Sequence, residues 1–356
     1  MTKISGRLRI AVLYGGLSSE HDVSLMSATN VMRALDPAKY DLVPIYITRD
    51  GRWFLGKFVD GVPDRPSAGR EACLVPGGAG RLLALEGGKV DELPPVDAVF
   101  PVLHGLNGED GSIQGLVQAA GVPLVGCGIA GSANALDKDL TKRLLLQAGV
   151  PVARSVTILA GAAPAFAEVA ATLGLPVFVK PARQGSSVGV SKVVDEAGYA
   201  AALELGFRHD PKLLVEAFVK GREVEVAVLE APDGSLFVSR PGEIAPAESH
   251  GFYSYDAKYV DADGAKVIVP ADLPPEVEER LKALALRAFR AVGCDAMARV
   301  DFFVTADFEV FLNELNTIPG FTDISMYPKA MQASGIGYAE LIDRLVAHGM
   351  ARHQQR

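Results

Sequence analysis

The sequence predicts an α/β protein with more than one domain. The chain has 356 residues, and at roughly 150 residues per domain this length corresponds to two or three domains. Hydrophobic residues make up 49% of it and charged residues 22%, which supports a buried core and excludes a disordered or collagen-like protein. Short β-rich runs alternate with segments of helical periodicity, as in folds that layer helices on sheets.

Residues 1–135 are expected to form the first α/β domain, around a mostly parallel sheet. Its expected elements are, in chain order, a strand at 9–14, a helix over 23–35, a strand at 43–47, loops and peripheral hairpins over 56–88, and a strand at 98–103. Such sheets bind ligands beyond the carboxyl ends of their parallel strands. The polar residues that follow the first and last of these strands are therefore candidate site residues.

Two further α/β segments, with α+β character in places, are expected over 136–220 and 221–356. The elements expected in the first are a helix over 136–148 and strands at 176–181 and 213–218. Those expected in the second are a strand at 223–229, a long polar loop over 245–266, a helix over 275–292, strands at 299–304 and 309–316, and two terminal helices. Three tyrosines and a lysine indicate that the loop is a lid rather than a disordered linker.

Charge and cysteine content restrict the partners and the compartment. The formal charge of −8, from 43 acidic and 35 basic residues, repels a phosphate backbone and disfavours nucleic-acid binding as the main function. Cys73, Cys127 and Cys294 form no CxxC pair, so we expect a reducing compartment and neither a disulfide framework nor a zinc site. The N-terminus is polar, and no apolar run reaches the roughly 18 residues of a membrane span. We therefore expect a cytoplasmic protein with no membrane or nucleic-acid partner.

The last two predicted strands carry the densest group of candidate ligands. If they pair as a hairpin that turns at residues 307–308, positions whose numbers sum to 615 lie opposite each other. Asp301 then faces Glu314, Arg299 faces Asn316, and residues two apart share a face. Three oxygen ligands beside one cation suit Mg²⁺, although a solvated sheet face with alternating polar residues would produce the same pattern.

Two glycine-containing loops that follow strands indicate phosphate chemistry. Residues 317–322 come directly after the candidate ligands, and the glycine there frees backbone N–H groups for an oxyanion. Lys180 ends a buried strand and precedes the glycine- and serine-rich turn 184–189, which could form a nest of N–H donors around phosphates. The turn is not a Walker A sequence, and a plain hairpin is the alternative interpretation.

Two loops of the first domain carry polar residues whose role the sequence leaves open. Residues 15–24 follow the first strand without the GxGxxG spacing of a dinucleotide fingerprint. Glu20 in this loop could interact with a helix dipole or with a substrate ammonium group. The loop HGLNGEDG, residues 104–111, could be a turn or part of the same crevice. The six histidines show no metal-ligand spacing, and no Ser-His-Asp order is identifiable.

Six motifs, in order, resemble the D-alanine–D-alanine ligases of the ATP-grasp superfamily. They are GGLSSEHDVSL, HGLNGEDG, KPARQGSSVGVSKV, PGEI, FYSYDAKY and ARVDFF…NELNTIPGFT, and they run from Gly15 to about Pro328. The resemblance implies a three-domain ATP-grasp architecture. Its parts are a Rossmann-like N-terminal domain (1–135) for the first D-alanine, a central domain (136–220) for ATP, and a C-terminal domain (221–356) for Mg²⁺, the acyl phosphate and the second D-alanine.

The resemblance also implies roles for individual residues. The ATP contacts fall on Lys138, Lys180, Ser187, Glu216, Ala217, Val219 and Glu223, with the lysines and Ser187 on phosphates, 216–219 on adenine and Glu223 on the ribose. The ligands of two Mg²⁺ ions, which Mn²⁺ can replace, are Asp301, Glu314 and Asn316.

The substrate and catalytic roles follow from the same resemblance. Arg299 and the Gly320 N–H stabilise the acyl phosphate and the tetrahedral intermediate. Glu20 binds the ammonium of the first D-alanine, with His104 nearby. The carboxylate of the second binds to Lys258, Ser325 and the Met326 N–H. Tyr259, Ser186 and Glu20 orient or deprotonate the nucleophile.

The reaction that the resemblance implies has two steps. ATP phosphorylates the carboxylate of one D-alanine, and the amine of a second attacks the acyl phosphate to form a peptidoglycan precursor.

There are three alternative functions. The first is a ligase that takes D-lactate or D-serine as its second substrate, which Tyr259 and Lys258 disfavour. The second is a non-catalytic ATP-binding relative, which would be expected to lose a metal ligand or Arg299. A nicotinamide dehydrogenase lacks the fingerprint spacing. Asp323 stands where family members usually have a small or neutral residue. A homodimer is expected from the resemblance to the family and from no motif of the sequence.

Overall fold

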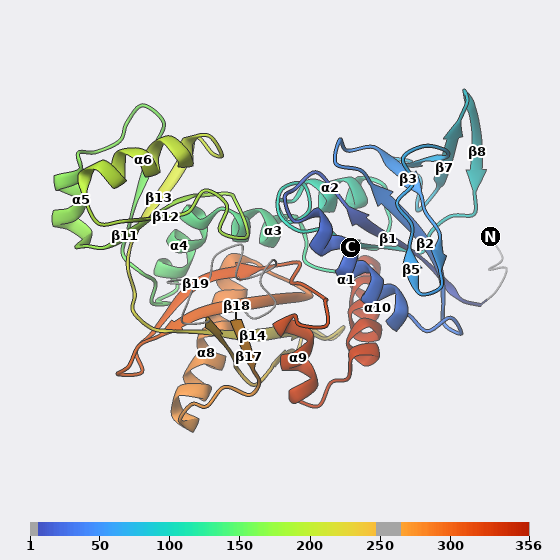
Figure 1. The fold of residues 1–356 in the computed structure, drawn as a ribbon. Coiled ribbons are helices and arrows are strands. Elements are labelled where there is room, and N and C mark those ends of the chain that lie inside the picture. The colour runs from blue at the N-terminus through green and yellow to red at the C-terminus, as the bar shows by residue number, and fades with distance from the viewer. Residues whose placement is uncertain (1–5, 247–264, 356) are drawn as a thin grey trace.

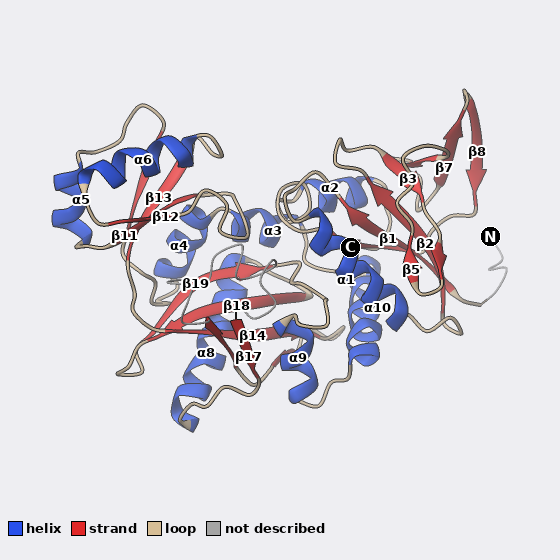
Figure 2. Cartoon of the chain, in the orientation of Figure 1, coloured by secondary structure: helices blue, strands red, loops and turns tan. Residues whose placement is uncertain are grey.

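The structure, a computed structural model, describes residues 6–246 and 265–355. Three main sheets, each with its own helices, occupy different parts of the molecule (Figures 1 and 2). All three lie within the three segments expected from the sequence, and the boundaries at 135 and 220 stay predictions. No helix in the described ranges is both long enough and apolar enough to cross a membrane.

The first sheet has seven strands and is parallel only in its centre. Its strands, in spatial order, are β8 (Lys89–Leu93), β7 (Leu82–Glu86), β6 (Glu71–Leu74), β3 (Trp53–Leu55), β2 (Tyr40–Ile47), β1 (Leu8–Gly15) and β9 (Ala98–Val102). Only β2, β1 and β9 are parallel neighbours, so the expectation of a mostly parallel sheet is wrong. Short turns join β6, β7 and β8, and short connections can join only antiparallel neighbours.

Two helices and a small ribbon complete this part of the chain. Helix α1 (His21–Ala34) follows β1, helix α2 (Ser112–Ala119) follows β9, and β4 (Phe58–Val59) pairs with β5 (Val62–Pro63). The stretch 56–88 therefore contains the expected hairpin, but it also gives β6 and β7 to the main sheet. The loops that carry Glu20 and His104 begin where the parallel strands β1 and β9 end.

The second sheet is antiparallel and has four strands. They are, in spatial order, β10 (Ser155–Leu159), β13 (Lys212–Ala217), β11 (Val177–Pro181) and β12 (Ser191–Val193). Helices α5 (Phe166–Leu173) and α6 (Glu196–Phe207) share a hydrophobic cluster with this sheet. The loop 184–189 connects β11 to β12, as expected for a turn after the strand that bears Lys180.

The helix expected over 136–148 is wrong at its start, because the structure divides this region into two helices. Helix α3 (Ile129–Leu136) ends at Asp137, whose backbone is extended, and α4 (Lys138–Gln147) begins after it. The Asp137 carboxylate accepts hydrogen bonds from the backbone N–H groups of Asp139 and Leu140, an N-cap that starts a new helix. Lys138 is consequently the first residue of α4.

The third sheet has six antiparallel strands. They are β17 (Ala265–Ile268), β16 (Gly242–Pro246), β14 (Arg222–Glu230), β18 (Met297–Val304) and β19 (Val310–Asn316), with β15 (Leu236–Val238) paired to β14. Helix α8 (Pro275–Val292) packs on one face, and α9 (Met326–Ala333) and α10 (Tyr338–Gln354) follow β19. The loop expected over 245–266 is shorter than predicted, since β16 and β17 include both of its ends. Residues 247–264, with Lys258 and Tyr259, lie outside the described residues.

The predicted pairing of the last two strands is confirmed at the candidate ligands. Asp301 lies opposite Glu314 and Arg299 opposite Asn316. Beyond Asp301 the register shifts by one, so that Asn313 is the extra residue of a β-bulge. A bulge redirects side chains, and Asn313 and Glu314, although consecutive, both line the same cavity.

Two hydrophobic clusters connect the parts of the molecule. One contains apolar residues of β14, β18, β19 and α8, together with Ala135 of α3 and Leu145 of α4. The other joins β1, α1 and β9 to α9 and α10, so that the last helix packs against the first sheet (Figure 1). These contacts fix the loops of the first sheet opposite the ends of β18 and β19.

Candidate active site

Two adjoining cavities contain most of the residues predicted from the sequence. The first is lined by residues from all three parts of the chain, among them Glu20, His104, Glu109, Lys138, Ser186, Arg299, Glu314, Asn316 and Gly320. The second is lined by residues of the central and C-terminal parts, among them Lys180, Ser187, Glu216, Ala217, Val219 and Glu223. The cavities meet at Lys138, Gly185, Ser186 and Glu314, which line both. A group bound in one cavity can therefore reach a group bound in the other.

The second cavity combines apolar walls with a carboxylate that is paired to two lysines, of which Lys180 lines the cavity and Lys142 lies behind it. Phe178 and Phe218, whose ring centroids are 5.8 Å apart, form a wall suited to a planar base. Glu216 forms ion pairs with Lys180 and, at 2.9 Å, with Lys142. Burial raises the pKa of Glu216, but the two ammonium groups lower it further, so the pKa lies below its ordinary value. The Glu216 side chain thus holds the lysines, and Lys142 was missed from the sequence because nothing local marks its partner.

Lys138 and the loop 184–189 lie at the boundary between the cavities. The Lys138 ammonium donates to the Gln184 carbonyl at 2.7 Å and is 3.6 Å from Oε2 of Glu314. Ser186 and Ser187 have left-handed backbones, with φ of 49° and 60°, a conformation that costs about 1–3 kcal/mol per residue and is concentrated at functional loops. Such backbones can turn successive N–H groups toward an anion. This geometry supports the phosphate interpretation over a plain hairpin.

Asp301, Glu314 and Asn316 form an oxygen-rich group beside the shared boundary. Nδ2 of Asn316 donates to Oδ2 of Asp301 at 3.0 Å, and Glu314 is the direct cross-strand neighbour of Asp301. Asp301 lines neither cavity among the described residues, whereas Glu314 lines both. Two carboxylates and one amide oxygen beside the boundary of the two cavities fit Mg²⁺, which prefers few protein ligands and completes its shell with phosphate oxygens and water.

Arg299 is held by two carboxylates on the same sheet face. Its Nε and Nη2 donate to Asp301 at 2.8 and 2.7 Å, and its Nε is 3.0 Å from Oε2 of Glu225. Burial lowers the pKa of Arg299, but Asp301 and Glu225 raise it well above its ordinary value, so the guanidinium stays charged. Glu225 was not predicted as a site residue. Its face of β14 carries Glu223 and Glu225 first and the apolar Ala227 and Leu229 after them, and this change from polar to apolar residues was the available signal.

The Glu20 carboxylate projects into the first cavity. Ser186 Oγ donates a hydrogen bond to Oε1 of Glu20. Glycines at 105 and 185 leave room for Oε2, because a Cβ added there would lie 2.7 and 2.8 Å from it. Glu20 occupies the N-cap position of α1, but its side chain makes no capping hydrogen bond. Contact with a ligand is therefore the better-supported of the two interpretations of this residue.

The His104 side chain connects two loops at the floor of the first cavity. Its Nδ1 is 2.9 Å from the Ile318 carbonyl, and its Nε2 is 3.2 Å from Oγ of Ser27 in α1. Burial lowers the pKa of His104, so the ring is neutral at pH 7. With both ring nitrogens bound by the protein, His104 positions the loop that follows β19.

Glu109 also lines the first cavity and was not predicted as a site residue. Its Oε2 accepts the N–H of Gly105, and its Oε1 that of Ile318, both at 2.9 Å. Burial and the neighbouring charge of Glu20 raise the pKa of Glu109 to about 7, although both N–H groups and Arg299 oppose this shift. An acidic residue inside HGLNGEDG could have been proposed from the sequence, but only the fold shows its contact with the 317–322 loop.

We expect the Glu109→Gln variant to change how stability depends on pH. The carboxyl binds its proton more tightly in the folded protein, with a pKa of about 7, than in the unfolded chain, where the value is near 4.5. Its contribution to stability is therefore fully present below pH 4.5 and is lost as the pH rises through 7. The difference in free energy of unfolding, wild type minus variant, should decrease over this range in urea titrations. Glu86→Gln, at an exposed strand end, is the control, and a difference that does not vary with pH would contradict the assignment.

The loop after β19 brings Gly320 into the first cavity and places Ser325 behind it. A Cβ on Gly320 would lie 2.6 Å from Oγ of Ser325, which accepts the N–H of Thr322 at 3.0 Å. Ser325 and Met326 line neither cavity among the described residues, but Met326 begins α9, so its N–H is not used within that helix. Asp323 accepts a hydrogen bond of 3.0 Å from Asn30 of α1, which gives this departure from the family pattern a local partner.

Comparison with known proteins decides the family. A model described as the D-ala D-ala ligase N-terminus matches residues 9–127, and one described as the D-ala D-ala ligase C-terminus matches residues 144–347. A D-alanine–D-alanine ligase A of Brucella suis is 62% identical over 349 residues, which cover 98% of this chain and 99% of the relative. The chain belongs to the D-alanine–D-alanine ligase family.

Solved structures of family members have the same overall fold. The D-alanine–D-alanine ligase of Coxiella burnetii has a TM-score of 0.85 and 36% identity, over 98% of this chain and 96% of that one. The VanG D-Ala:D-Ser ligase of Enterococcus faecalis has a TM-score of 0.82 and 36% identity, over 96% and 99%. The expected mixed α/β fold is therefore shown, and overall fold similarity does not separate D-alanine from D-serine as the second substrate.

Proposed function

We propose that the chain catalyses the ATP-dependent ligation of two D-alanines to D-alanyl-D-alanine through an acyl phosphate. The high identity to a curated D-alanine–D-alanine ligase supports this activity over the D-lactate, D-serine and non-catalytic alternatives. The observation that carries the proposal is the junction of the two cavities at Lys138, Gly185, Ser186 and Glu314. A nucleotide phosphate in one cavity would there meet a carboxylate in the other, which is what phosphoryl transfer between them requires.

In the first step, the γ-phosphoryl group of ATP moves to a carboxylate oxygen of the first D-alanine, and ADP leaves. Lys138, Lys180 and Ser187 bind the phosphates in this proposal, backbone groups of 216–219 contact adenine, and Glu223 contacts the ribose. Asp301, Glu314 and Asn316 would hold two Mg²⁺ ions, or Mn²⁺ in their place, whose charge offsets that of the phosphates.

In the second step, the amine of the second D-alanine attacks the acyl carbon, and inorganic phosphate leaves with the bonding electrons. Arg299 and the Gly320 N–H stabilise the negative charge that develops on oxygen. Glu20 binds the ammonium of the first D-alanine, and its hydrogen bond from Ser186 forms part of a network with Tyr259. We assign to this network the orientation of the nucleophile or the removal of the proton that the amine loses as the amide forms. The residues assigned to the carboxylate of the second D-alanine are Lys258, Ser325 and Met326.

Phosphate release tests this function directly. Purified protein with ATP and Mg²⁺ should release phosphate when D-alanine is added and should not do so with L-alanine. D-Lactate in the presence of limiting D-alanine should be a poor second substrate. The absence of D-alanine-dependent release would refute the proposal.

Tyr259 provides a test of second-substrate choice. We expect Tyr259→Phe to raise the rate with D-lactate relative to the rate with D-alanine, because the hydroxyl is assigned to the network that handles an amine nucleophile. The measurement is the ratio of the kcat/KM values for the two substrates, with Tyr199→Phe, on α6, as a control outside both cavities. An unchanged ratio in Tyr259→Phe would remove Tyr259 from the second subsite.

The cellular setting is proposed from the family and the composition. We place the enzyme in the cytoplasm as a homodimer that supplies the dipeptide for peptidoglycan synthesis. The proposed division of labour follows the predicted domains, with 1–135 for the first D-alanine, 136–220 for ATP, and 221–356 for metal, acyl phosphate and second D-alanine. Size-exclusion chromatography with light scattering would test the dimer.

A further inference from the structure

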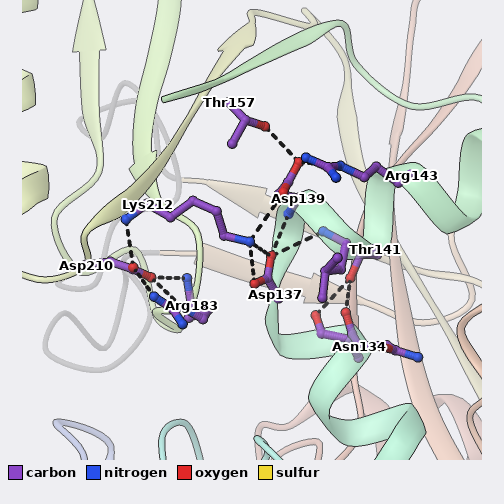
Figure 3. Close-up of polar contacts among 11 residues, drawn as sticks. Asn134, Asp137, Asp139, Thr141, Arg143, Thr157, Arg183, Asp210 and Lys212 are labelled. Carbon is purple, nitrogen blue, oxygen red and sulfur yellow. Dashed lines mark hydrogen bonds and ion pairs between the residues drawn. The ribbon is translucent and has the colours of Figure 1, made fainter. Parts of the chain in front are cut away.

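A cluster of three buried aspartates, a partly buried lysine and an exposed arginine lies next to the phosphate end of the site but lines neither cavity. Its members are Asp137 and Asp139 of α4 and its cap, Arg183, Asp210, and Lys212 of β13 (Figure 3). The three aspartates are 3–7% exposed. Burying three carboxylates is costly, and apolar residues of similar size often give a protein the same stability as buried ion pairs. Stability alone therefore does not explain this arrangement.

Lys212 connects the start of β13 to the start of α4. Its ammonium is 2.7 and 2.5 Å from the two carboxylate oxygens of Asp137 and 3.3 Å from Oδ2 of Asp139. Burial raises the pKa of Asp139, but hydrogen bonds from Thr157 and Lys212 lower it below its ordinary value. The Lys212 ammonium is thus held between the carboxylates of Asp137 and Asp139.

Asp210 connects the same strand to the phosphate loop. It accepts the Arg183 N–H at 2.9 Å and the Arg183 guanidinium at 3.1 and 2.6 Å. It also accepts the backbone N–H of Lys212 at 2.9 Å. Arg183 immediately precedes Gln184, the first residue of the loop 184–189, so this carboxylate fixes where the loop begins.

Backbone hydrogen bonds carry both connections to Lys138. Asp137 caps α4 one residue before Lys138. The Lys138 N–H donates to the Ala182 carbonyl at 2.9 Å, and the Ala182 N–H donates to the Lys212 carbonyl at 3.0 Å. The Lys138 ammonium in turn donates to the Gln184 carbonyl. The cluster thus holds the phosphate lysine and the phosphate loop in a fixed relation to each other.

We infer that the cluster of Asp137, Asp139, Arg183, Asp210 and Lys212 is a positioning device for ATP. Its members act through Lys138 and the loop 184–189, so the inference rests on the proposed role of Lys138 at the phosphates. It concerns the nucleotide first, because Lys138 and the loop 184–189 are the groups assigned to its phosphates. The loop also reaches the D-alanine site, since Ser186 donates a hydrogen bond to Glu20.

The test compares ATP with D-alanine in matched variants. Lys212→Gln should raise both the KM and the calorimetric Kd for ATP with Mg²⁺ about tenfold or more, since a misplacement of about 1 Å can cost up to about a hundredfold. The KM for D-alanine should rise by a clearly smaller factor than the KM for ATP, since the loop reaches the D-alanine site through Ser186 and Glu20. Lys212→Arg should restore part of the ATP affinity. Glu278→Gln, which removes ion pairs to Arg240 and Lys282 outside both cavities, is the control.

Asp137→Asn provides a second route if Lys212→Gln folds poorly. Asparagine keeps the helix cap but loses the charge opposite Lys212, so the same selective rise for ATP is expected. A merely structural role would lower the melting temperature and the active fraction without changing either constant. Folded variants with unchanged ATP constants, or with equal losses for ATP and D-alanine, would overturn the inference.

A double-mutant cycle separates this inference from the proposed role of Lys138. Lys138→Met alone should weaken ATP binding, and if it does not, the assignment of Lys138 is at fault. If it does, its effect and that of Lys212→Gln should be non-additive, because both changes act on the same contact. Additive effects would show that the cluster does not act through Lys138.

Discussion

Replacing Glu314 by glutamine is expected to reduce turnover about a thousandfold while leaving the fold intact. The change removes one negative ligand from the group formed with Asp301 and Asn316, and a metal ion contributes several kcal/mol to such a transition state. Glutamine has nearly the same shape, and Glu314 is only partly buried, 3.6 Å from Lys138. The measurements are kcat at saturating ATP and Mg²⁺ and the melting temperature.

The control for this variant lies on the same hairpin. Glu309 is exposed near the turn and lines neither cavity, so Glu309→Gln should keep normal kcat. Near-normal turnover in Glu314→Gln at saturating Mg²⁺ would show that this carboxylate is not a metal ligand.

Replacing Arg299 by lysine is expected to lower kcat about 10²–10³-fold, the usual loss when one preorganised donor to a developing oxyanion is removed. Lysine keeps the charge, so Asp301 and Glu225 remain paired with a cation. The lysine ammonium has one nitrogen, so it cannot reproduce the two hydrogen bonds that Nε and Nη2 of Arg299 donate to Asp301. The loss should appear in kcat more than in either KM.

Arg222→Lys is the matched control for this prediction. Arg222 lies on the neighbouring strand and also donates through two nitrogens to one carboxylate, that of Glu243, at 2.8 and 2.6 Å. It lines neither cavity, so its replacement should alter stability without altering kcat. Equal losses of kcat in both variants would mean that the Arg299 effect is structural.

The face that carries the candidate ligands was predictable because two local signals agree. Alternation along β18 and β19 separates polar from apolar residues, and a hairpin fixes which residues face each other. The pairs Asp301–Glu314 and Arg299–Asn316 follow from these two facts. The bulge at Asn313 does not follow from them. An extra residue can be inserted at several positions of a hairpin without changing the alternation of polar and apolar residues in the sequence.

Other features depend on contacts that sequence patterns do not record. The strands between β2 and β9 are short and largely polar or half-exposed, so their sequences do not separate strands of the main sheet from peripheral hairpins. The short connections between β6, β7 and β8 decide for antiparallel pairing. Glu109, Glu225 and Lys142 each look like an ordinary charged residue until a distant element supplies the partner. The break at Asp137 illustrates the same limit, since an aspartate within apolar periodicity predicts a helix interior as readily as a cap.

The packing of α10 on the first sheet has a consequence for the order of events during synthesis. The ribosome makes β1 first and α10 last among the described elements, yet side chains of both share one hydrophobic cluster. That face of the sheet cannot be covered while most of the chain is still to be made, whereas domains usually fold in turn as they emerge. We expect nascent chains that end before α10 to retain a chaperone-binding, aggregation-prone surface, which would make the emergence of α10, rather than that of the first sheet, the event that completes this hydrophobic cluster.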